Sequence, residues 1–462
     1  MGPRLGRGLG KGEDVTIINS VVPFIAIIVM LVVVHELGHF LTAKLAGVRV
    51  LEFGIGYPPR LWGAKLGDTE YTINALPLGG FVRLLGEEDP TDPRSLAKQS
   101  RPVRLVVLSA GSIMNFLFAI ALFTAGQMIP REVPVGRAII DTVMPGSPAE
   151  EAGLQQGDII SKINGREIKN VPETGKTIRL NLGETMTWVV ERNGESVTAR
   201  VRARWAPPDI VHVVQPGEDV RSVAEQLGLS AASVRAAADI ESTLEPGREI
   251  TIGDGPDAVS YVPQEGDTVS SVAQRLRVSA EAVAAAAGLP DQDKLEPGQE
   301  IRFAQGPTGI IIAAQYPFTE MQSSSLFKAV PLAVRNTFDS LALARNEIIS
   351  WVKGGASPEI SGPIGIAQAT GEVVEDAGWK VLMDFAALLS VNLAIINILP
   401  LPMLDGGRMV FVLLEVVRGG RRVAAHKEAL VHLIGLVALL TLVVVISYFD
   451  VVRIIQGGSM FR

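Results

Sequence analysis

Four long runs of apolar residues divide the chain, and they predict helices that cross a membrane. The runs are residues 17–46, 103–129, 379–417 and 430–449. About 20 apolar helical residues cross the hydrocarbon core of a bilayer, and each run reaches that length. In the third run, Pro400 and Pro402 break the helix and free backbone groups at membrane depth. The pattern predicts a multi-pass α-helical membrane protein with four spans, the third of them broken.

The section between the first two runs has a different pattern. Within residues 48–102, short stretches alternate between apolar and polar positions and are separated by glycines and prolines. Such alternation is typical of strands, so we expect a small β-hairpin beside the membrane. Its role is either that of a surface loop or that of an exposed edge that pairs with an extended substrate.

The long section between the second and third runs predicts several soluble elements. Residues 134–204 alternate like a β-rich α+β domain. Residues 211–253 and 260–304 are two copies of an internal repeat, and each copy reads as strand, two short helices and strand (βααβ). Residues 325–352 carry apolar side chains at helical spacing, which predicts an amphipathic helix against the membrane surface or the outer domains, or packed in a core. Residues 1–16 are polar and rich in glycine, and we expect a flexible N-terminus.

Composition agrees with a membrane protein that has soluble parts. The 462 residues are 47% hydrophobic, and the net charge is −7. The mean hydropathy is +0.30. No basic block suits nucleic acid, so nucleic acid is excluded as a partner. Cysteine is absent, and a metal would have to be held by histidine, aspartate or glutamate. The chain has only five histidines, which are His35, His39, His212, His426 and His432.

Positive charges orient the spans. Lysines and arginines gather in the loop 41–102 and in the short loop after the third run, and the positive-inside rule places both loops in the cytoplasm. These residues are Lys44, Arg49, Arg60, Lys65, Arg83, Arg94, Lys98, Arg101, Arg418, Arg421, Arg422 and Lys427. Residues 131–378 are then expected on the outer side.

The first apolar run contains a cluster of ionisable residues. His35 and His39 are four residues apart, so both project from one face of a helix and can bind a single Zn²⁺, while Glu36 can activate a water beside it. Each ionisable group near the centre of a bilayer costs about 2.5–3.5 kcal/mol, so the cluster needs a partner such as a bound cation. A proton or ion relay without metal is the alternative interpretation.

Two histidines leave a third protein ligand to be found. At about 1.5 Å per helical residue, His35 lies about 27 Å from Ile17 and Asp405 about 36 Å from Val381, so with tilt and the proline break their depths can match. His426, His432 and Glu415 are weaker candidates because they lie toward the inner surface or in a loop, and Glu36 is better suited as the base.

Motifs in three spans resemble the site-2 protease family of intramembrane zinc metalloproteases, and most closely the bacterial proteases that regulate sigma factors. The motifs are His35-Glu-Leu-Gly-His39, Ala110-Gly-Ser-Ile-Met-Asn115, and Asn392 through Asn397 with Pro400 and Leu404-Asp405-Gly406. The resemblance implies that His35, His39 and Asp405 bind zinc, that Glu36 is catalytic, and that Asn392 and Asn397 hold the substrate. It also implies that residues 48–85 are the membrane-associated hairpin of the family. Ser112 stands where proline is usual.

The outer segments resemble two kinds of binding module. Residues 134–204, with Pro145-Gly-Ser-Pro-Ala149 and Gly157-Asp158, are similar to a PDZ domain, which binds extended peptides by strand addition. A packed β-rich spacer with an empty groove is the alternative. The two repeats resemble LysM modules, which bind glycans such as peptidoglycan. Ala238 and Ala287 replace the usual asparagine, and a spacer role is the alternative. Residues 361–366 also resemble a family segment before the third span.

These features together predict an intramembrane zinc endopeptidase in a bacterial inner membrane, with the PDZ-like and LysM-like domains extracytoplasmic. Its expected substrates are the transmembrane segments of single-span membrane proteins, such as anti-sigma factors that have already been truncated. One alternative is a non-catalytic envelope receptor that binds peptide and peptidoglycan. Another is a zinc or proton transporter, which would need more polar residues along its spans.

Overall fold

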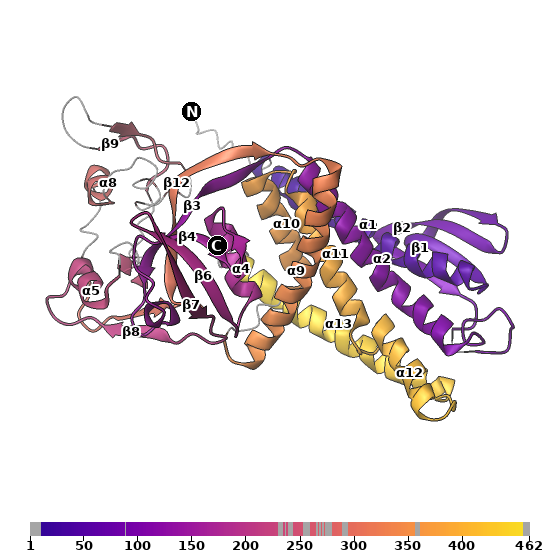
Figure 1. Ribbon diagram of the computed structural model, residues 1–462. Helices are drawn as coiled ribbons and strands as arrows, with labels where there is room; N and C mark the ends of the chain where they lie inside the picture. Colours follow the sequence, from indigo (N-terminus) through magenta and orange to yellow (C-terminus); the bar gives the residue numbers. More distant parts are fainter. Residues whose placement is uncertain are drawn as a thin grey trace, which may run out of the picture. The chain divides into compact units, whose positions relative to one another are not determined.

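The computed structural model describes residues 11–87, 89–229, 294–355 and 361–455, together with scattered residues between 230 and 293. The chain forms two compact units (Figure 1). The first unit consists of Met1–Glu132, Met321–Ala344 and Pro358–Arg462, and the second of Val133–Glu320 and Arg345–Ser357. Residues 1–10 of the predicted flexible N-terminus lie outside the described residues, and the prediction was wrong for residues 11–16, which begin a helix.

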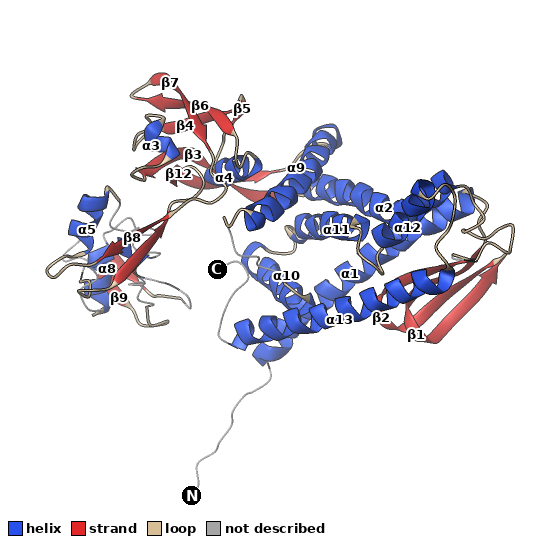
Figure 2. Cartoon of the chain, turned by 90° about the horizontal axis from the view of Figure 1, so that it is seen from below, coloured by secondary structure: helices blue, strands red, loops and turns tan. Residues whose placement is uncertain are grey.

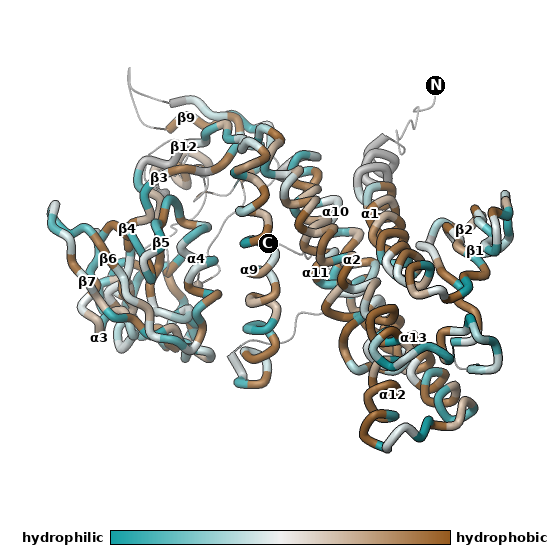
Figure 3. The backbone as a smooth tube through the Cα atoms, turned by 45° about the vertical axis from the view of Figure 1, so that its right-hand side comes forward, coloured by the Kyte–Doolittle hydropathy of each residue, from teal (hydrophilic) through white to brown (hydrophobic). Residues whose placement is uncertain are grey.

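The first unit is a bundle of mainly apolar helices (Figure 3). They are α1 (Lys11–Leu45), α2 (Arg101–Met128), the first part of α9 (Leu326–Val352), α10 (Pro363–Ala377), α11 (Leu382–Ile398), α12 (Asp405–Val417) and α13 (Ala425–Ile455). In the described part of the chain, three helices are long and apolar enough to cross a membrane, namely α1 from Ser20, α2 and α13. The predicted count of four spans is therefore not confirmed. The third run is divided into α11 and α12, because the chain leaves the helix at Leu399, just before Pro400.

The predicted hairpin is formed by two long antiparallel strands, β1 (Val50–Leu66) and β2 (Thr69–Leu84) (Figure 2). The first half of β1 is the central strand of this sheet, because Phe53 pairs with Tyr71 on one side and with Val82 on the other. Residues 80–84 are consequently an edge strand. This edge lies near α1, since a Cβ atom at residue 80 would meet Val33.

Helix α10 was not predicted from the sequence. It packs against α1, and its N-terminus is capped from α13. The Asp450 carboxylate is 1% exposed and accepts hydrogen bonds from the backbone N–H groups of Gly362 and Gly365, each at 2.9 Å. A carboxylate at this position satisfies free N–H groups of the first helical turn, although it lies 85 to 88 residues away along the chain.

The second unit contains a sheet with the strand order β12-β3-β4-β6-β7, and β5 pairs with β4 (Figure 2). The strands are β3 (Arg131–Val143), β4 (Ile159–Ile163), β5 (Arg166–Glu167), β6 (Thr185–Arg192), β7 (Glu195–Arg202) and β12 (Ile310–Gln322), accompanied by helices α3 (Pro148–Glu151) and α4 (Val171–Leu180). Trp188, Ile160 and Ile140 are fully buried in its core. This sheet domain is wider than the predicted range 134–204 because β12 joins it after the repeats.

The strands of the two repeats pair across the repeats. The elements are β8 (Asp209–Val213), α5 (Val220–Leu227), β9 (Ile250–Ile252), β10 (Val259–Tyr261), α8 (Ala280–Ala287) and β11 (Glu300–Ala304). The first strand of repeat one, β8, pairs with the last strand of repeat two, β11, and β9 pairs with β10. Helices α5 and α8 are each one of the two helices expected in their repeat. The second helix expected in repeat one and the first expected in repeat two lie partly or largely outside the described residues.

Candidate metal centre

The two histidines of α1 point their ring nitrogens at one place. They are one helical turn apart, and each residue is only 7% exposed. The Nε2 atoms of His35 and His39 lie 3.2 Å apart, and each is 3.1 Å from Oδ2 of Asp405. The structure therefore brings together the three side chains that the resemblance named as zinc ligands, and all three ligand atoms lie within 4.8 Å of one another.

Asp405 reaches the histidines because of the loop that precedes it. It is the first residue of α12, directly after the break at Pro400 and Pro402. The loop turns tightly against the end of α11, since a Cβ atom at Gly406 would lie 2.2 Å from the Leu399 carbonyl oxygen. His432 of α13 supports this loop, because its Nδ1 accepts a hydrogen bond from the Met403 backbone N–H at 2.9 Å. His432, a weaker ligand candidate from the sequence, thus contacts the loop before the aspartate.

The spacing of the three atoms fits a tetrahedral zinc ion. With zinc–ligand distances of about 2.0–2.1 Å, neighbouring ligand atoms of a tetrahedron are about 3.3–3.4 Å apart. The observed separations of 3.1–3.2 Å are close to this value. Three protein ligands leave a fourth position for water or substrate, as in catalytic zinc sites.

The protonation of the histidines also favours a cation. Nδ1 of His39 lies 2.8 Å from the carbonyl oxygen of Val107 on α2. A carbonyl only accepts, so Nδ1 carries the hydrogen, and the Nε2 of a neutral His39 presents a lone pair to the other two atoms. With both histidines neutral and Asp405 ionised, the three converging atoms hold at most one proton. A bound cation satisfies all three at once.

Helix α2 lies directly against both imidazoles at Gly111. A Cβ atom at this position would lie 2.4 Å from Nε2 of His39 and 2.5 Å from Cε1 of His35. Only glycine permits this approach of the two helices. The sequence placed Gly111, Ser112 and Asn115 in a motif of the second span, but it gave no sign that Gly111 meets the metal ligands.

Glu36 is half-buried on the same turn of α1 and is held by the hairpin. Its Oε2 accepts a hydrogen bond of 3.0 Å from the backbone N–H of Val82, on the edge strand of the hairpin sheet. Phe40 of α1 packs edge-on against Phe53 of β1, which fixes the hairpin on this helix. Burial, and then the charge of Glu36, raise the pKa of Tyr57 on β1.

The predicted substrate residues lie on α11. Asn392 is exposed and Asn397 is half-exposed, so neither amide is enclosed by its own unit. Of the remaining ligand candidates, His426 is exposed, and Glu415 is occupied by arginines.

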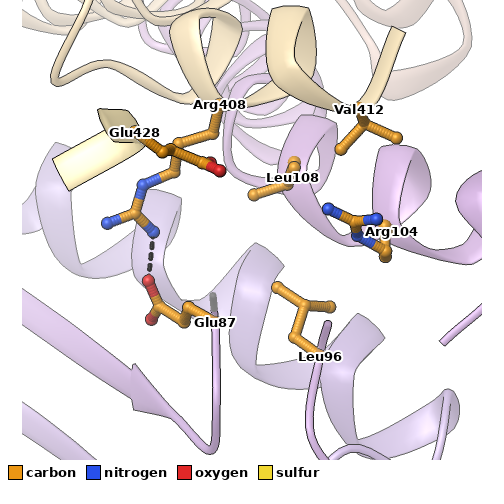
Figure 4. Close-up of a pocket in the computed structure, with 7 residues that line it drawn as sticks. All are labelled: Glu87, Leu96, Arg104, Leu108, Arg408, Val412 and Glu428. Atoms are coloured by element: carbon orange, nitrogen blue, oxygen red, sulfur yellow. Dashed lines mark hydrogen bonds and ion pairs between the residues drawn. The ribbon is translucent and has the colours of Figure 1, made fainter. Parts of the chain in front are cut away.

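A charged layer surrounds Glu415 near the ends of α2 and α12, formed by Glu87, Arg101, Arg104, Arg408, Glu415 and Arg422. Glu415 is 7% exposed at its side chain and contacts Arg104 at 2.6 Å, Arg101 at 3.2 Å and Arg422 at 3.3 Å. Arg408 pairs with Glu87 beside Arg104 and Leu108 (Figure 4). These ion pairs tie α12, which begins with Asp405, to α2.

Metal-dependent hydrolysis requires side chains that hold a cation and a base beside them, and this bundle of apolar helices provides side chains for both roles. Fold and site together are those of an intramembrane metalloprotease.

The comparison with known proteins leads to the same class. The model of peptidase family M50 matches residues 23–442. The zinc metalloprotease RasP of Oceanobacillus iheyensis is 27% identical over 94% of this chain and 99% of its own length. A putative zinc metalloprotease of Clostridium perfringens is 28% identical over 91% of this chain and 95% of its own length, and one of Ralstonia nicotianae is 29% identical over 94% and 98%. The chain belongs to peptidase family M50, the site-2 protease family, and is a membrane-embedded zinc metalloprotease.

Proposed function

We propose that this protease cleaves the transmembrane segments of single-span membrane proteins, with His35, His39 and Asp405 as its zinc ligands and Glu36 as its base. The observation that carries the proposal is the convergence of the three ligand atoms inside a bundle of apolar helices. A cleavage site within such a bundle suits a substrate that is itself embedded in lipid.

The residues of the chain divide the chemistry between them. When bound, zinc polarises the scissile carbonyl and makes water a stronger nucleophile. Glu36 takes a proton from the attacking water and delivers it to the leaving amine, which is general base and then general acid catalysis. The Val82 N–H holds one oxygen of Glu36 and so fixes the orientation of the carboxylate.

A helical substrate must unwind before attack, because its carbonyl groups are hydrogen-bonded within the helix. A segment that adds as a strand to the hairpin sheet near Val82 would lie beside Glu36 in an extended form. The amides of Asn392 and Asn397, which are at least partly exposed, would hold its backbone near the metal. Anti-sigma factors that have been truncated on their outer side are a substrate class of the required kind.

We further propose that the second unit acts on the outer side of a bacterial inner membrane. Its sheet domain would bind peptide as a PDZ-like domain, and the two repeats would bind peptidoglycan as LysM-like modules. The positive charges of the loop 41–102 favour a cytoplasmic position for that loop, and with it an outer position for the second unit.

The decisive experiment is co-expression with a truncated anti-sigma factor, comparing the wild type with Glu36→Gln. Loss of the proton acceptor should lower cleavage at least 100-fold, in the range typical for a general base, while zinc stays bound. Glu195→Gln is the matched control, because Glu195 is an exposed residue of β7 and should leave cleavage unchanged. Undiminished cleavage by Glu36→Gln would remove the mechanism. A zinc-loaded wild type that cleaves no membrane segment would instead favour the envelope receptor.

A further inference from the structure

One face of α2 contacts both metal-ligand histidines but contributes no ligand of its own. Val107, Gly111 and Asn115 are spaced four residues apart, so they form one line along the helix. The Val107 carbonyl accepts from His39, Gly111 makes room for both imidazoles, and Asn115 contacts His35. Val107 and Asn115 therefore contact the two rings at Nδ1, away from the metal-facing Nε2, whereas Gly111 lies beside the Nε2 atoms themselves.

Asn115 is fully enclosed and held in place. The residue is 0% exposed, and its backbone carbonyl accepts a hydrogen bond of 2.8 Å from the Ser390 hydroxyl of α11. Its side-chain Nδ2 lies 3.3 Å from Nδ1 of His35, whereas its Oδ1 is buried without a hydrogen-bond partner in the described structure. A buried amide oxygen without a partner is costly, by about 1–3 kcal/mol.

The two orientations of this amide correspond to two tautomers of His35. With Nδ2 toward the ring, the amide donates to a bare Nδ1, and the hydrogen of a neutral His35 then lies on Nε2, facing Asp405. Rotating the amide by 180° brings Oδ1 to the ring, where it accepts the hydrogen of Nδ1. The lone pair of His35 Nε2 is then free for a metal, as it already is in His39.

We infer that Asn115 is a positioning residue of the zinc site, whose Oδ1 holds His35 in the tautomer that carries hydrogen on Nδ1. Zinc binding and rotation of the amide are coupled, because the ion needs the Nε2 lone pair and only the rotated amide can accept the hydrogen that Nδ1 then carries. The inference rests on the zinc site of the proposed function, but it is independent of the substrate.

The test measures zinc affinity by competition with a chromophoric chelator, using the purified full-length protein in detergent. Asn115→Leu keeps the approximate size and removes the acceptor, and Asn115→Asp keeps an acceptor oxygen at the same place. Thr124→Val is the matched control on α2, because its hydroxyl is buried but bonds only to the Ile120 carbonyl of its own helix. Removing a hydrogen-bond partner of a metal-bound histidine typically weakens binding 10–100-fold.

We expect Asn115→Leu to weaken zinc binding 10–100-fold, and Asn115→Asp and Thr124→Val to stay within about threefold of the wild type. Equal zinc affinity of Asn115→Leu and the wild type would overturn the inference, and so would an equal loss in Asn115→Leu and Asn115→Asp, since packing would then explain the effect. The visible spectrum of the cobalt-loaded variants gives a second measurement, and it should change in Asn115→Leu but not in Asn115→Asp. A wild type that binds no zinc would refute the metal site itself, which separates the two failures.

Discussion

Replacing Gly111 by alanine should destroy the zinc site without unfolding the protein. The added Cβ atom would lie 2.4 Å from Nε2 of His39, and real Cβ atoms essentially never approach below 3.0 Å, so a displacement of at least 0.6 Å is required. Metal sites tolerate about 0.2 Å in their ligand distances. Helix α2 cannot simply withdraw, because Ser390 and Glu415 hold it from α11 and α12. We expect zinc affinity to fall more than about 100-fold, or about 2.7 kcal/mol, because the change displaces a ligand rather than only its support.

The assay is the zinc content of the purified protein, followed by chelator competition. Gly175→Ala in α4 is the matched control, because the same substitution there meets nothing within 4 Å. Both variants gain the helix propensity of alanine, about 1 kcal/mol per residue, so a general loss of fold is not expected in either. If Gly111→Ala bound zinc as tightly as the wild type, the close approach of α2 to the ligands could not be as the structure has it.

Two further predictions concern ion pairs outside the metal centre. Glu415→Gln leaves Arg104 buried beside a neutral side chain, and we expect the free energy of unfolding to fall by about 3 kcal/mol. This value is at the low end for a buried pair because Arg101 and Arg422 are partly exposed. Unfolding of the full chain in mixed detergent micelles measures the change, and an unchanged midpoint would contradict the prediction. In the sheet domain, burial opposes ionisation of Asp158, but hydrogen bonds from Arg192 and the Gln155 N–H outweigh it and lower the pKa of Asp158 below its ordinary value of 3.8. The stability that the ionised group contributes is therefore complete above about pH 4 and is lost as the pH falls through the lowered pKa. Hydrogen exchange of β4 and β6, corrected for intrinsic rates, should consequently become faster in acid in the wild type and change less in Asp158→Asn.

The apolar runs predicted α1, α2 and α13 well, because a continuous run of apolar residues has few structural alternatives. The third run was harder, since Pro400 and Pro402 indicated a break but not that the following residues form a separate helix α12. Helix α10 was not predicted from the sequence, because the residue that caps it, Asp450, is distant in the chain. The pairing of strands between the two repeats was not predicted either. Two copies with the same pattern offer the same edges, so similarity cannot decide which strands pair.

The metal centre also has parts that the sequence could predict and parts that it could not. The spacing of His35 and His39 gives a local signal that any helix would display on one face. Asp405 was found only through membrane depth and family resemblance, because nothing local connects it to α1. The Val107 carbonyl and the Val82 N–H could not be found at all, since a backbone group leaves no trace in the residue type.

Helix α2 provides no zinc ligand, yet it contacts every element that does. Val107 and Asn115 orient the histidines of α1, and Arg104 binds Glu415 on the helix that begins with Asp405. The Ser390 bond joins it to α11, which carries the two substrate asparagines. Because ligand distances tolerate so little error, the relative position of α1 and α12 has to be set by a rigid intermediate. A shift of α2 would therefore disturb the imidazoles and the aspartate together, so substitutions on its inner face should act on zinc affinity as one group.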